Sequence, residues 1–218
     1  MAESQALLYF HINPPAGNEA AFETWHAEHL ARRVEMPGFL NARRFHLAEG
    51  EGPRILVTYD LADAAALQSP EYLQLRAHEA ETPHDRDMLA SAEIVTRRLY
   101  RSIDTDEPWA AAWTDHPPFV MSVALEPPPE LEADFHAWYR EEHSPMLMAA
   151  PGWRRIRRYE QVDGNGPRFM ALHELESLGG FKSDEYTAAI STPWRIRTTT
   201  AVVRRERYIF KLAQGFGR

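Results

Sequence analysis

One motif occurs twice in this chain of 218 residues. The first copy reads Phe22, Trp25, Glu28, His29, Pro37, Gly38, Phe39, Arg43, Arg44 and Phe45, and the second reads Phe135, Trp138, Glu142, His143, Pro151, Gly152, Trp153, Arg157, Arg158 and Tyr159. The copies lie 113 residues apart at Trp25 and Trp138 but 114 apart at His29 and His143, so the second copy contains one inserted residue. A repeat on this scale predicts two folding units that pack as a pseudo-symmetric pair.

The repeat divides the chain into two units of about a hundred residues, which is a normal domain size. We expect residues 1–103 to form the first unit, 104–118 to form a linker and 119–218 to form the second unit. Hydrophobic residues make up 44% of the chain and charged residues 26%, proportions typical of a globular protein.

Composition also excludes several classes of function. A net charge of -8 without a basic tract argues against nucleic acid or an anionic membrane as the main partner. The chain has no cysteine, which excludes disulfides, a thiolate nucleophile and a cysteine-ligated metal. Met1 to Gln5 do not begin a signal peptide and no eighteen apolar residues follow one another, so we expect a cytoplasmic protein.

Both halves show the same order of predicted elements. Alternation and turn signals predict strands at 7–13, 40–47, 55–61 and 94–102 with helices from Asn18 and over 62–81, and then strands at 119–126, 155–161, 169–175 and 201–210 with helices over 131–148 and 178–190. The order β-α-β-β-α-β is that of the ferredoxin-like fold, an antiparallel sheet with two helices on one face. We expect an α+β protein in which the two uncovered sheet faces close into a barrel around an interior pocket.

The second copy is the more informative for family resemblance. Its run Phe135, Trp138, Glu142, His143, Ser144 and Pro145, followed by Pro151 and Gly152, resembles the dimeric α+β-barrel superfamily and, within it, the EthD-like group. The resemblance covers both halves and implies a tandem-duplicated form in which one chain supplies both halves of the barrel. That superfamily includes isomerases, polyketide cyclases, cofactor-free monooxygenases and haem-binding peroxidases, so the resemblance does not choose a reaction.

The first strand carries our first catalytic candidate, His11. It shares a strand face with Tyr9 and Asn13, whereas Leu8, Phe10 and Ile12 on the other face suit packing against helices. The second half has Glu126 where the first has Asn13, as a single asymmetric active site would require. A satisfied core histidine is the alternative interpretation of His11.

Further candidates come from the repeated positions. His29 and His143 each follow a glutamate at a helix end, which suits a general base but equally suits a helix cap. For substrate binding we select the repeated aromatic, basic and strand residues Tyr59, His173, Arg44, Arg158, Trp25 and Trp138 together with Glu126. Packing of the tryptophans in the core and surface pairing of the arginines are the structural alternatives.

Metal binding is a weaker interpretation of the ten histidines. His26 and His29 have the i, i+3 spacing of a helical zinc or iron site, with Glu28 nearby, but no second ligand cluster of defined spacing appears. A haem site would need one axial histidine and a large apolar cavity. We therefore expect no metal and no cofactor.

These observations together predict a cofactor-independent acid/base enzyme, a lyase, cyclase or isomerase. Its substrate would be a small apolar aromatic or lactone-like molecule in the barrel interior, with a histidine as proton shuttle. The alternatives are a haem- or metal-dependent oxygenase and a non-catalytic protein that binds a small molecule. The sequence leaves open whether two fused barrels pair as a homodimer.

Overall fold

The computed structural model of the protein describes residues 5–103 and 116–217. The chain forms two compact units. Unit 1 comprises the described residues up to His116, with Gln161–Asn165 and the end of the chain from Phe210, and unit 2 comprises Pro117–Glu160 and Gly166–Ile209. Most of the linker expected over 104–118 lies outside the described residues.

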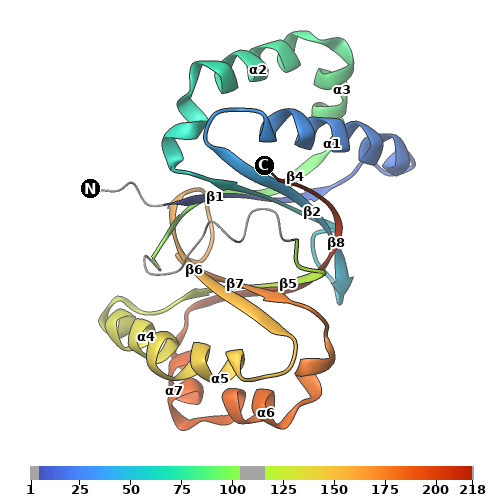
Figure 1. Ribbon diagram of the computed structural model, residues 1–218. Coiled ribbons are helices and arrows are strands. Elements are labelled where there is room, and N and C mark those ends of the chain that lie inside the picture. The colour runs from blue at the N-terminus through green and yellow to red at the C-terminus, as the bar shows by residue number, and fades with distance from the viewer. Residues whose placement is uncertain (1–4, 104–115, 218) are drawn as a thin grey trace. The chain divides into compact units, whose positions relative to one another are not determined.

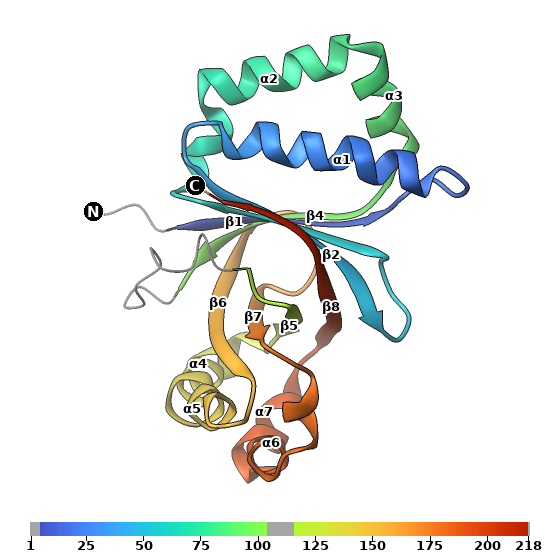
Figure 2. The ribbon, with the colours of Figure 1, turned by 45° about the vertical axis from the view of Figure 1, so that its right-hand side comes forward.

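The described part of the first half contributes four strands and three α-helices to unit 1 (Figure 1). In order they are β1 (Ala6–Asn13), α1 (Glu19–Val34), β2 (Phe39–Glu49), β3 (Ile55–Leu61), the 3-10 helix η1 (Ala64–Gln68), α2 (Pro70–Glu81), α3 (Pro83–Ser91) and β4 (Glu93–Ser102). All three α-helices lie on one side of these strands, as Figure 2 also shows.

Unit 2 has the same order of major elements. They are β5 (Phe119–Glu126), η3 (Pro129–Leu131), α4 (Glu132–Trp138), the π-helical turn η4 (Tyr139–His143), α5 (Ser144–Met148), β6 (Trp153–Asp163), β7 (Phe169–Leu175), η5 (Gly179–Lys182), α6 (Asp184–Ser191), α7 (Pro193–Ala201) and β8 (Arg204–Gly217). The end of β6 and the end of β8 belong to unit 1.

Strand pairing is antiparallel in both units. In unit 1, β1 lies between β3 and β4, and β2 pairs with the other edge of β3. In unit 2, β7 lies between β5 and β6. The eight strands are hydrogen-bonded in the order β1-β3-β2-β8-β5-β7-β6-β4, a closed barrel. The expected α+β barrel is therefore confirmed.

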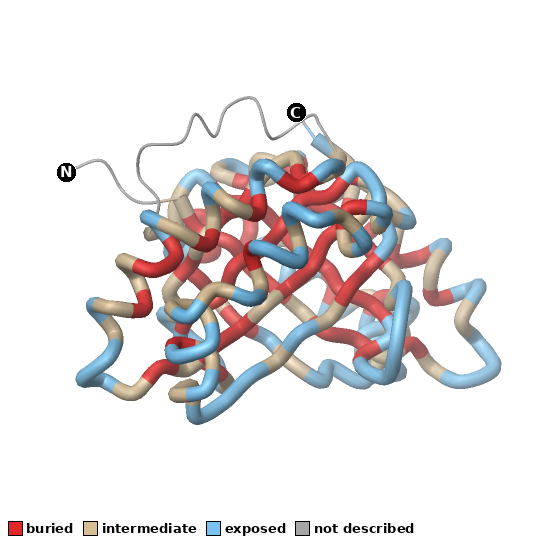
Figure 3. The backbone as a smooth tube through the Cα atoms, turned by 90° about the horizontal axis from the view of Figure 1, so that it is seen from below, coloured by how far each residue is buried: buried red, intermediate tan, exposed pale blue. Residues whose placement is uncertain are grey.

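Each unit has its own apolar core. The alternation predicted for the first strand is confirmed, because Leu8 and Ile12 belong to the unit-1 core, with Phe10 packed against it. The central strands β3 and β7 are buried at every residue, and Figure 3 shows the strands as the most buried part of the backbone. None of the helices in residues 5–103 and 116–217 has the length and apolar character needed to cross a membrane.

The predicted helices are divided in the structure. Each second helix is followed by another that the pattern did not show, α3 or α7, and both begin at a proline in the first turn, Pro83 or Pro193. Proline fits that position because its missing N–H would have no partner there, yet it cannot continue a preceding helix. The predicted helix 62–81 therefore becomes η1 and α2, and the predicted strand 201–210 begins later, at Arg204.

The residue inserted in the second copy of the motif forms a π-helical turn, Tyr139–His143. A π turn absorbs one extra residue without ending a helix. It also preserves one contact: the ring centroids of Trp25 and His29 lie 4.7 Å apart in α1, and those of Trp138 and His143 lie 4.3 Å apart across the π turn. The insertion therefore leaves the repeated tryptophan and histidine side by side.

In the first copy of the repeated Pro-Gly turn, the structure requires a glycine at position 38. Gly38 has a φ of +80°, and a Cβ built on it would lie 2.6 Å from the Cβ of Ala66. Gly50, in the β2–β3 hairpin, has a similar φ of +78°, but a Cβ there would meet nothing within 4 Å. We predict that Gly38→Ala lowers the free energy of unfolding by at least about 1 kcal/mol more than Gly50→Ala, because both substitutions strain the backbone but only the first also creates a clash.

Urea denaturation of the two variants measures this difference. Equal losses of stability would show that the contact between Gly38 and Ala66 relaxes freely.

Candidate functional site

A pocket of about 250 Å³ lies in unit 1, on the helix-covered side of the strands. Its floor is the apolar face of β1 and β3, including Leu8, Phe10 and Val57. Helix α1 contributes one wall, and α2, α3 and β4 contribute the others. The pocket thus lies on the opposite face of β1 from the one on which the sequence analysis placed the site.

The pocket has a buried polar end and a partly exposed end. His29, Arg33 and Glu79 line the first and are at most 6% exposed. Leu89, Ile94 and other exposed side chains of α2, α3 and β4 line the second. A ligand would therefore bring its polar group to a fixed, dry set of charges.

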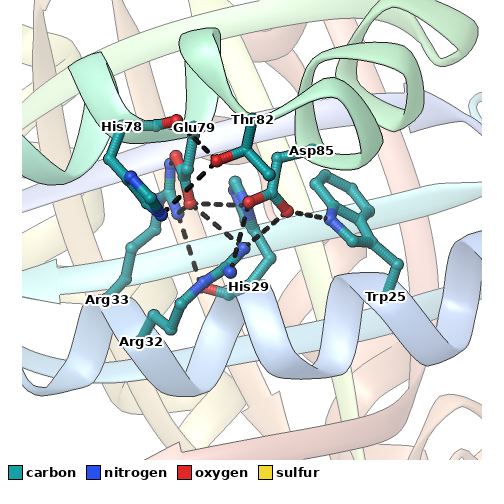
Figure 4. A network of polar contacts seen from close by, with 8 residues as sticks. All are labelled: Trp25, His29, Arg32, Arg33, His78, Glu79, Thr82 and Asp85. Atoms are coloured by element: carbon teal, nitrogen blue, oxygen red, sulfur yellow. Dashed lines mark hydrogen bonds and ion pairs between the residues drawn. The ribbon is translucent and has the colours of Figure 1, made fainter.

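Glu79 of α2 is the centre of this polar end (Figure 4). The guanidinium of Arg33 donates two hydrogen bonds to the Glu79 carboxylate, at 2.9 and 2.8 Å. His29 Nδ1 lies 3.1 Å from Glu79 Oε1, and Arg32 Nη2 lies 3.4 Å from the same oxygen. One buried carboxylate thus binds three side chains of α1.

A second carboxylate, Asp85 of α3, extends the network. It accepts a hydrogen bond from Trp25 Nε1 at 2.5 Å and from Arg32 Nη2 at 2.9 Å. Figure 4 shows these side chains meeting between α1 and the two helices that cover it. Trp25, a wall of the pocket, is therefore held at its polar edge, and its ring position is fixed.

Burial decides the charge states in the network. Burial alone would raise the pKa of Glu79, but its contacts with His29 and Arg33 outweigh this effect and lower the pKa, so the carboxylate is ionised. Burial lowers the pKa of His29 to about 4, with Glu79 opposing the shift. Burial also lowers the pKa of His26 far below its usual value. Both imidazoles are neutral at pH 7 and can accept a proton.

Tyr59 of β3 supplies a neutral hydroxyl to the pocket lining. Its pKa is raised because the side chain is buried, so the phenol keeps its proton. A neutral phenol can donate a hydrogen bond to a ligand oxygen. The pocket therefore combines a proton acceptor with a hydrogen-bond donor on apolar walls.

Unit 2 has a smaller pocket, of about 90 Å³, between its own strands and helices. Trp138, His143 and His173 line it. Burial lowers the pKa of His143 to about 4 and that of His173 to about 3. The pocket lining contains no carboxylate.

The structure thus distributes the predicted site residues over several places. Trp25, His29 and Tyr59 come together at the unit-1 pocket. Trp138, His143 and His173 come together at the unit-2 pocket. Tyr59 and His173, selected at equivalent strand positions of the two halves, thus lie in different pockets.

His11, Tyr9 and Asn13 do not line the unit-1 pocket. The Tyr9 hydroxyl lies 2.6 Å from His11 Nε2, and burial lowers the pKa of His11 to about 3. Asn13 lies at the end of β1, where its side chain donates a hydrogen bond to Glu93 and accepts one from the backbone of Arg54. These three residues have protein partners on the other face of β1.

The remaining three candidates also have structural partners. Arg44 Nη1 donates to the backbone carbonyl of Glu23, at 2.8 Å. The Arg158 guanidinium lies 5.7 Å from the ring centre of Tyr139. Glu126 accepts a hydrogen bond from the backbone N–H of Arg168, at 2.7 Å.

Glu79, Arg33 and Asp85 are the functional candidates that the sequence analysis missed. Glu79 and Asp85 lie in helices outside the repeated motif, and Arg33 is one of two adjacent arginines near the end of α1. The sequence did contain a signal for Glu79. It is a charged residue one turn before Pro83, and its helix has to pack against the helix that carries His29. No spacing rule connects it with His29, 50 residues earlier.

The residues present do not fit a metal or haem. Among the described residues, no three histidine, aspartate or glutamate side chains are grouped so that they could hold a metal ion. The unit-1 pocket, at about 250 Å³, is smaller than the roughly 300–1,000 Å³ of pockets for drug-sized ligands, and a haem is larger than such ligands. We therefore derive no chemical step through either group.

Comparison with known proteins gives structural matches only. No protein-family model matches the chain, and no curated protein matches it. Among solved structures, a proposed monooxygenase from Fusobacterium nucleatum matches with a TM-score of 0.61 and 11% identity over 100% of this chain and 96% of that chain. An anthrone oxidase-like protein matches with a TM-score of 0.65 and 10% identity over 100% of this chain and 94% of that chain.

A third match is a chlorite dismutase variant from Candidatus Nitrospira defluvii in complex with cyanide. Its TM-score is 0.66 and its identity 10%, over 98% of this chain and 92% of that chain. At such identities the matches establish a shared fold, the dimeric α+β barrel, in agreement with the closed strand order.

The comparisons correct the predicted reaction. The sequence predicts a cofactor-independent lyase, cyclase or isomerase acting in the barrel interior. The matched proteins are named for monooxygenase, anthrone oxidase and chlorite dismutase chemistry. These names favour the oxygenase alternative, and the lyase or isomerase prediction is wrong. The histidines indicated proton transfer, but they did not indicate which reaction that proton transfer serves.

We predict that Glu79→Gln lowers the free energy of unfolding by about 3 to 5 kcal/mol, because it leaves the buried Arg33 guanidinium without its counter-charge. Glu71→Gln, an exposed position on the same helix, is the matched control and should change stability by less than about 0.5 kcal/mol. Urea denaturation at pH 7 measures both variants. Similar midpoints for the two would show that the network contributes little to stability.

Acid should weaken the fold through its buried histidines. His143 has a pKa of about 4 in the folded protein, against about 6.5 when unfolded. Below pH 6.5 the unfolded chain binds a proton at His143 more readily than the folded chain does, so the free energy of unfolding falls as the pH is lowered. Above pH 6.5 His143 is neutral in both states and does not make the stability depend on pH. At pH 4.5 its share of the loss is about 2 to 3 kcal/mol.

His143→Gln should therefore lose less stability than the wild type between pH 7.5 and pH 4.5, in denaturation experiments at the two values. His84→Gln changes an exposed histidine and serves as the control. A loss in His143→Gln equal to that in the wild type would contradict the neutral, buried state of His143.

Proposed function

We propose that the protein is an oxygenase whose active site is the unit-1 pocket. The observation that carries the proposal is the buried pair of His29 and Glu79, 3.1 Å apart at one end of an apolar pocket. The names of the structural neighbours support the choice of reaction class. The proposal assigns to the pocket a substrate that itself supplies the electrons for oxygen reduction.

The pocket suggests the size of the substrate. A cavity of about 150 Å³ accommodates benzene, so a pocket of about 250 Å³ suits a molecule of one or two rings. Its apolar floor and aromatic wall favour an aromatic body, and its polar end favours a phenolic or ketone oxygen. We therefore propose a hydroxylated one- or two-ring aromatic substrate, with 1-naphthol as the test compound.

The reaction balances without an external reductant. Removal of the hydroxyl proton of 1-naphthol gives an electron-rich anion, whose negative charge is shared between the oxygen and the ring carbon opposite it. The anion reduces O₂ and forms a C–O bond, and loss of water leaves a new carbonyl. One 1-naphthol and one O₂ thus give one 1,4-naphthoquinone and one water, with one oxygen atom in each product.

Three side chains have distinct roles in this proposal. The neutral imidazole of His29 accepts the proton, and the nearby Glu79 carboxylate stabilises the imidazolium that forms. The Tyr59 hydroxyl donates a hydrogen bond to the substrate oxygen, where negative charge accumulates. Arg33 is a positioning residue, because it holds the Glu79 carboxylate through two hydrogen bonds.

We also propose that the chain arose as a tandem duplicate, with one ferredoxin-like repeat in each half and an EthD-like ancestry. The recurring motif and the similar element order of the two halves support this interpretation. A single unit-1 active site is consistent with divergence after duplication, because Glu79 has no carboxylate counterpart at the equivalent position in the second half.

The test is turnover of 1-naphthol under ¹⁸O₂. We expect oxygen consumption equal to product and one labelled atom in the quinone. His29→Gln and Tyr59→Phe should each lower kcat/KM by about 100-fold, the usual scale for losing one acid–base or hydrogen-bonding group. His84→Gln, an exposed helix residue outside the pocket, should keep wild-type activity.

Unlabelled product would contradict oxygenation by O₂. Equal activity of Tyr59→Phe, His29→Gln and the wild type would reject the unit-1 pocket as the active site. A thermal shift with 1-naphthol but no oxygen consumption would favour a non-catalytic binding protein instead.

A further inference from the structure

The unit-2 pocket differs in charge from the pocket of unit 1. Its lining includes three arginines, Arg195 of α7 and Arg205 and Arg207 of β8. Among the residues that the structure describes, no carboxylate forms an ion pair with any of these three guanidinium groups. In unit 1 the charges on the lining are largely paired, since Arg33 binds Glu79 and Arg97 binds Asp163.

The unit-2 arginines are partly fixed in place. Arg205 Nη2 donates to the backbone carbonyl of Thr199, at 2.6 Å. The Arg207 guanidinium lies 5.6 Å from the ring centre of Phe181. Such contacts reduce the entropy that the side chains would lose on binding a ligand.

Buried N–H groups point to the same kind of ligand. Trp138 Nε1 is buried, and no hydrogen-bond partner for it lies among the described residues. His173 Nδ1 accepts a hydrogen bond from Trp153 Nε1, which assigns the proton of this neutral ring to Nε2. That Nε2 is also buried and has no partner in the described part of the chain.

Both side chains are only 1% exposed and both line the pocket. Three guanidinium groups without a carboxylate partner in the described ranges, close to two buried N–H groups without an acceptor there, make this pocket electropositive and favour an anionic ligand. The rest of the lining, including Met121, Val123 and Leu147, is apolar. The ligand therefore needs a negative oxygen-rich group and a short apolar body.

The pocket volume limits that apolar body. A cavity of about 150 Å³ accommodates the six carbons of benzene, so the 90 Å³ of this pocket suits about four carbons. We propose that unit 2 binds a short-chain monocarboxylate of about three to five carbons, with its carboxylate between the arginines and its chain on the apolar floor. This site is separate from the proposed oxygenase pocket and does not depend on it.

Calorimetric titration of the full-length protein with butyrate, in low-chloride buffer at pH 7, tests the proposal. We expect a Kd of about 1 mM, as suits a ligand of six heavy atoms. Butyramide, which has the same shape but no charge, and formate, which has the charge but no chain, should each bind at least about tenfold more weakly. Butyramide as tight as butyrate, or formate as tight as butyrate, would overturn the proposal.

Matched variants locate the site. Arg195→Gln and Arg207→Gln should each weaken butyrate binding by about tenfold. Arg197→Gln is the control, because Arg197 lies on the same helix as Arg195 but pairs with Asp134 and does not line the pocket. Since Arg207 is exposed, its variant should fold even if Arg195→Gln does not. Unchanged binding in Arg207→Gln, or an equal loss in Arg197→Gln, would reject this pocket as the butyrate site.

Discussion

The buried carboxylate of Glu79 is the interaction on which unit 1 depends. It binds Arg33 through two hydrogen bonds and lies within ion-pair distance of His29, so it joins the helix that carries the histidines to the helix that covers them. A carboxylate buried without partners would be severely unfavourable, and these contacts offset the cost of its desolvation. The same contacts keep one end of the pocket charged, dry and fixed in geometry. Glu79 therefore contributes both to the stability of unit 1 and to the proposed chemistry of its pocket.

The two units use similar architecture for different electrostatics. In unit 1 the charges at the polar end of the pocket are paired, and the neutral His29 has a carboxylate beside it. In unit 2 the pocket has arginines but no carboxylate among its lining residues. A neutral imidazole beside a carboxylate suits proton transfer, whereas unpaired guanidinium groups suit the binding of an anion. The difference in charge comes from helices and strands alike, because Glu79 lies on α2 whereas Arg205 and Arg207 lie on β8.

The sequence predicted the strands well because their signals are local. Alternation identified 55–61, 119–126 and 169–175 at the bounds that the structure shows, and it assigned Leu8, Phe10 and Ile12 to the helix-facing side. It failed where the decisive partner is distant in sequence. No local pattern connects Glu79 with His29, and none shows that Tyr9 and His11 satisfy each other on the opposite face. Tertiary contacts alone decide such pairs.

Comparison of the two copies of the motif shows which of its residues have structural roles and which have chemical ones. What recurs in both copies is the contact between tryptophan and histidine and the Pro-Gly turn, and the π turn in unit 2 preserves that contact despite an inserted residue. Features preserved in this way are those that hold a helix on its strands, so a repeated histidine is not by itself evidence of catalysis. What distinguishes His29 from His143 is the neighbour contributed by a later helix, Glu79 in one unit and Arg195 in the other. The chemistry of each pocket therefore follows from the residues that differ between the copies.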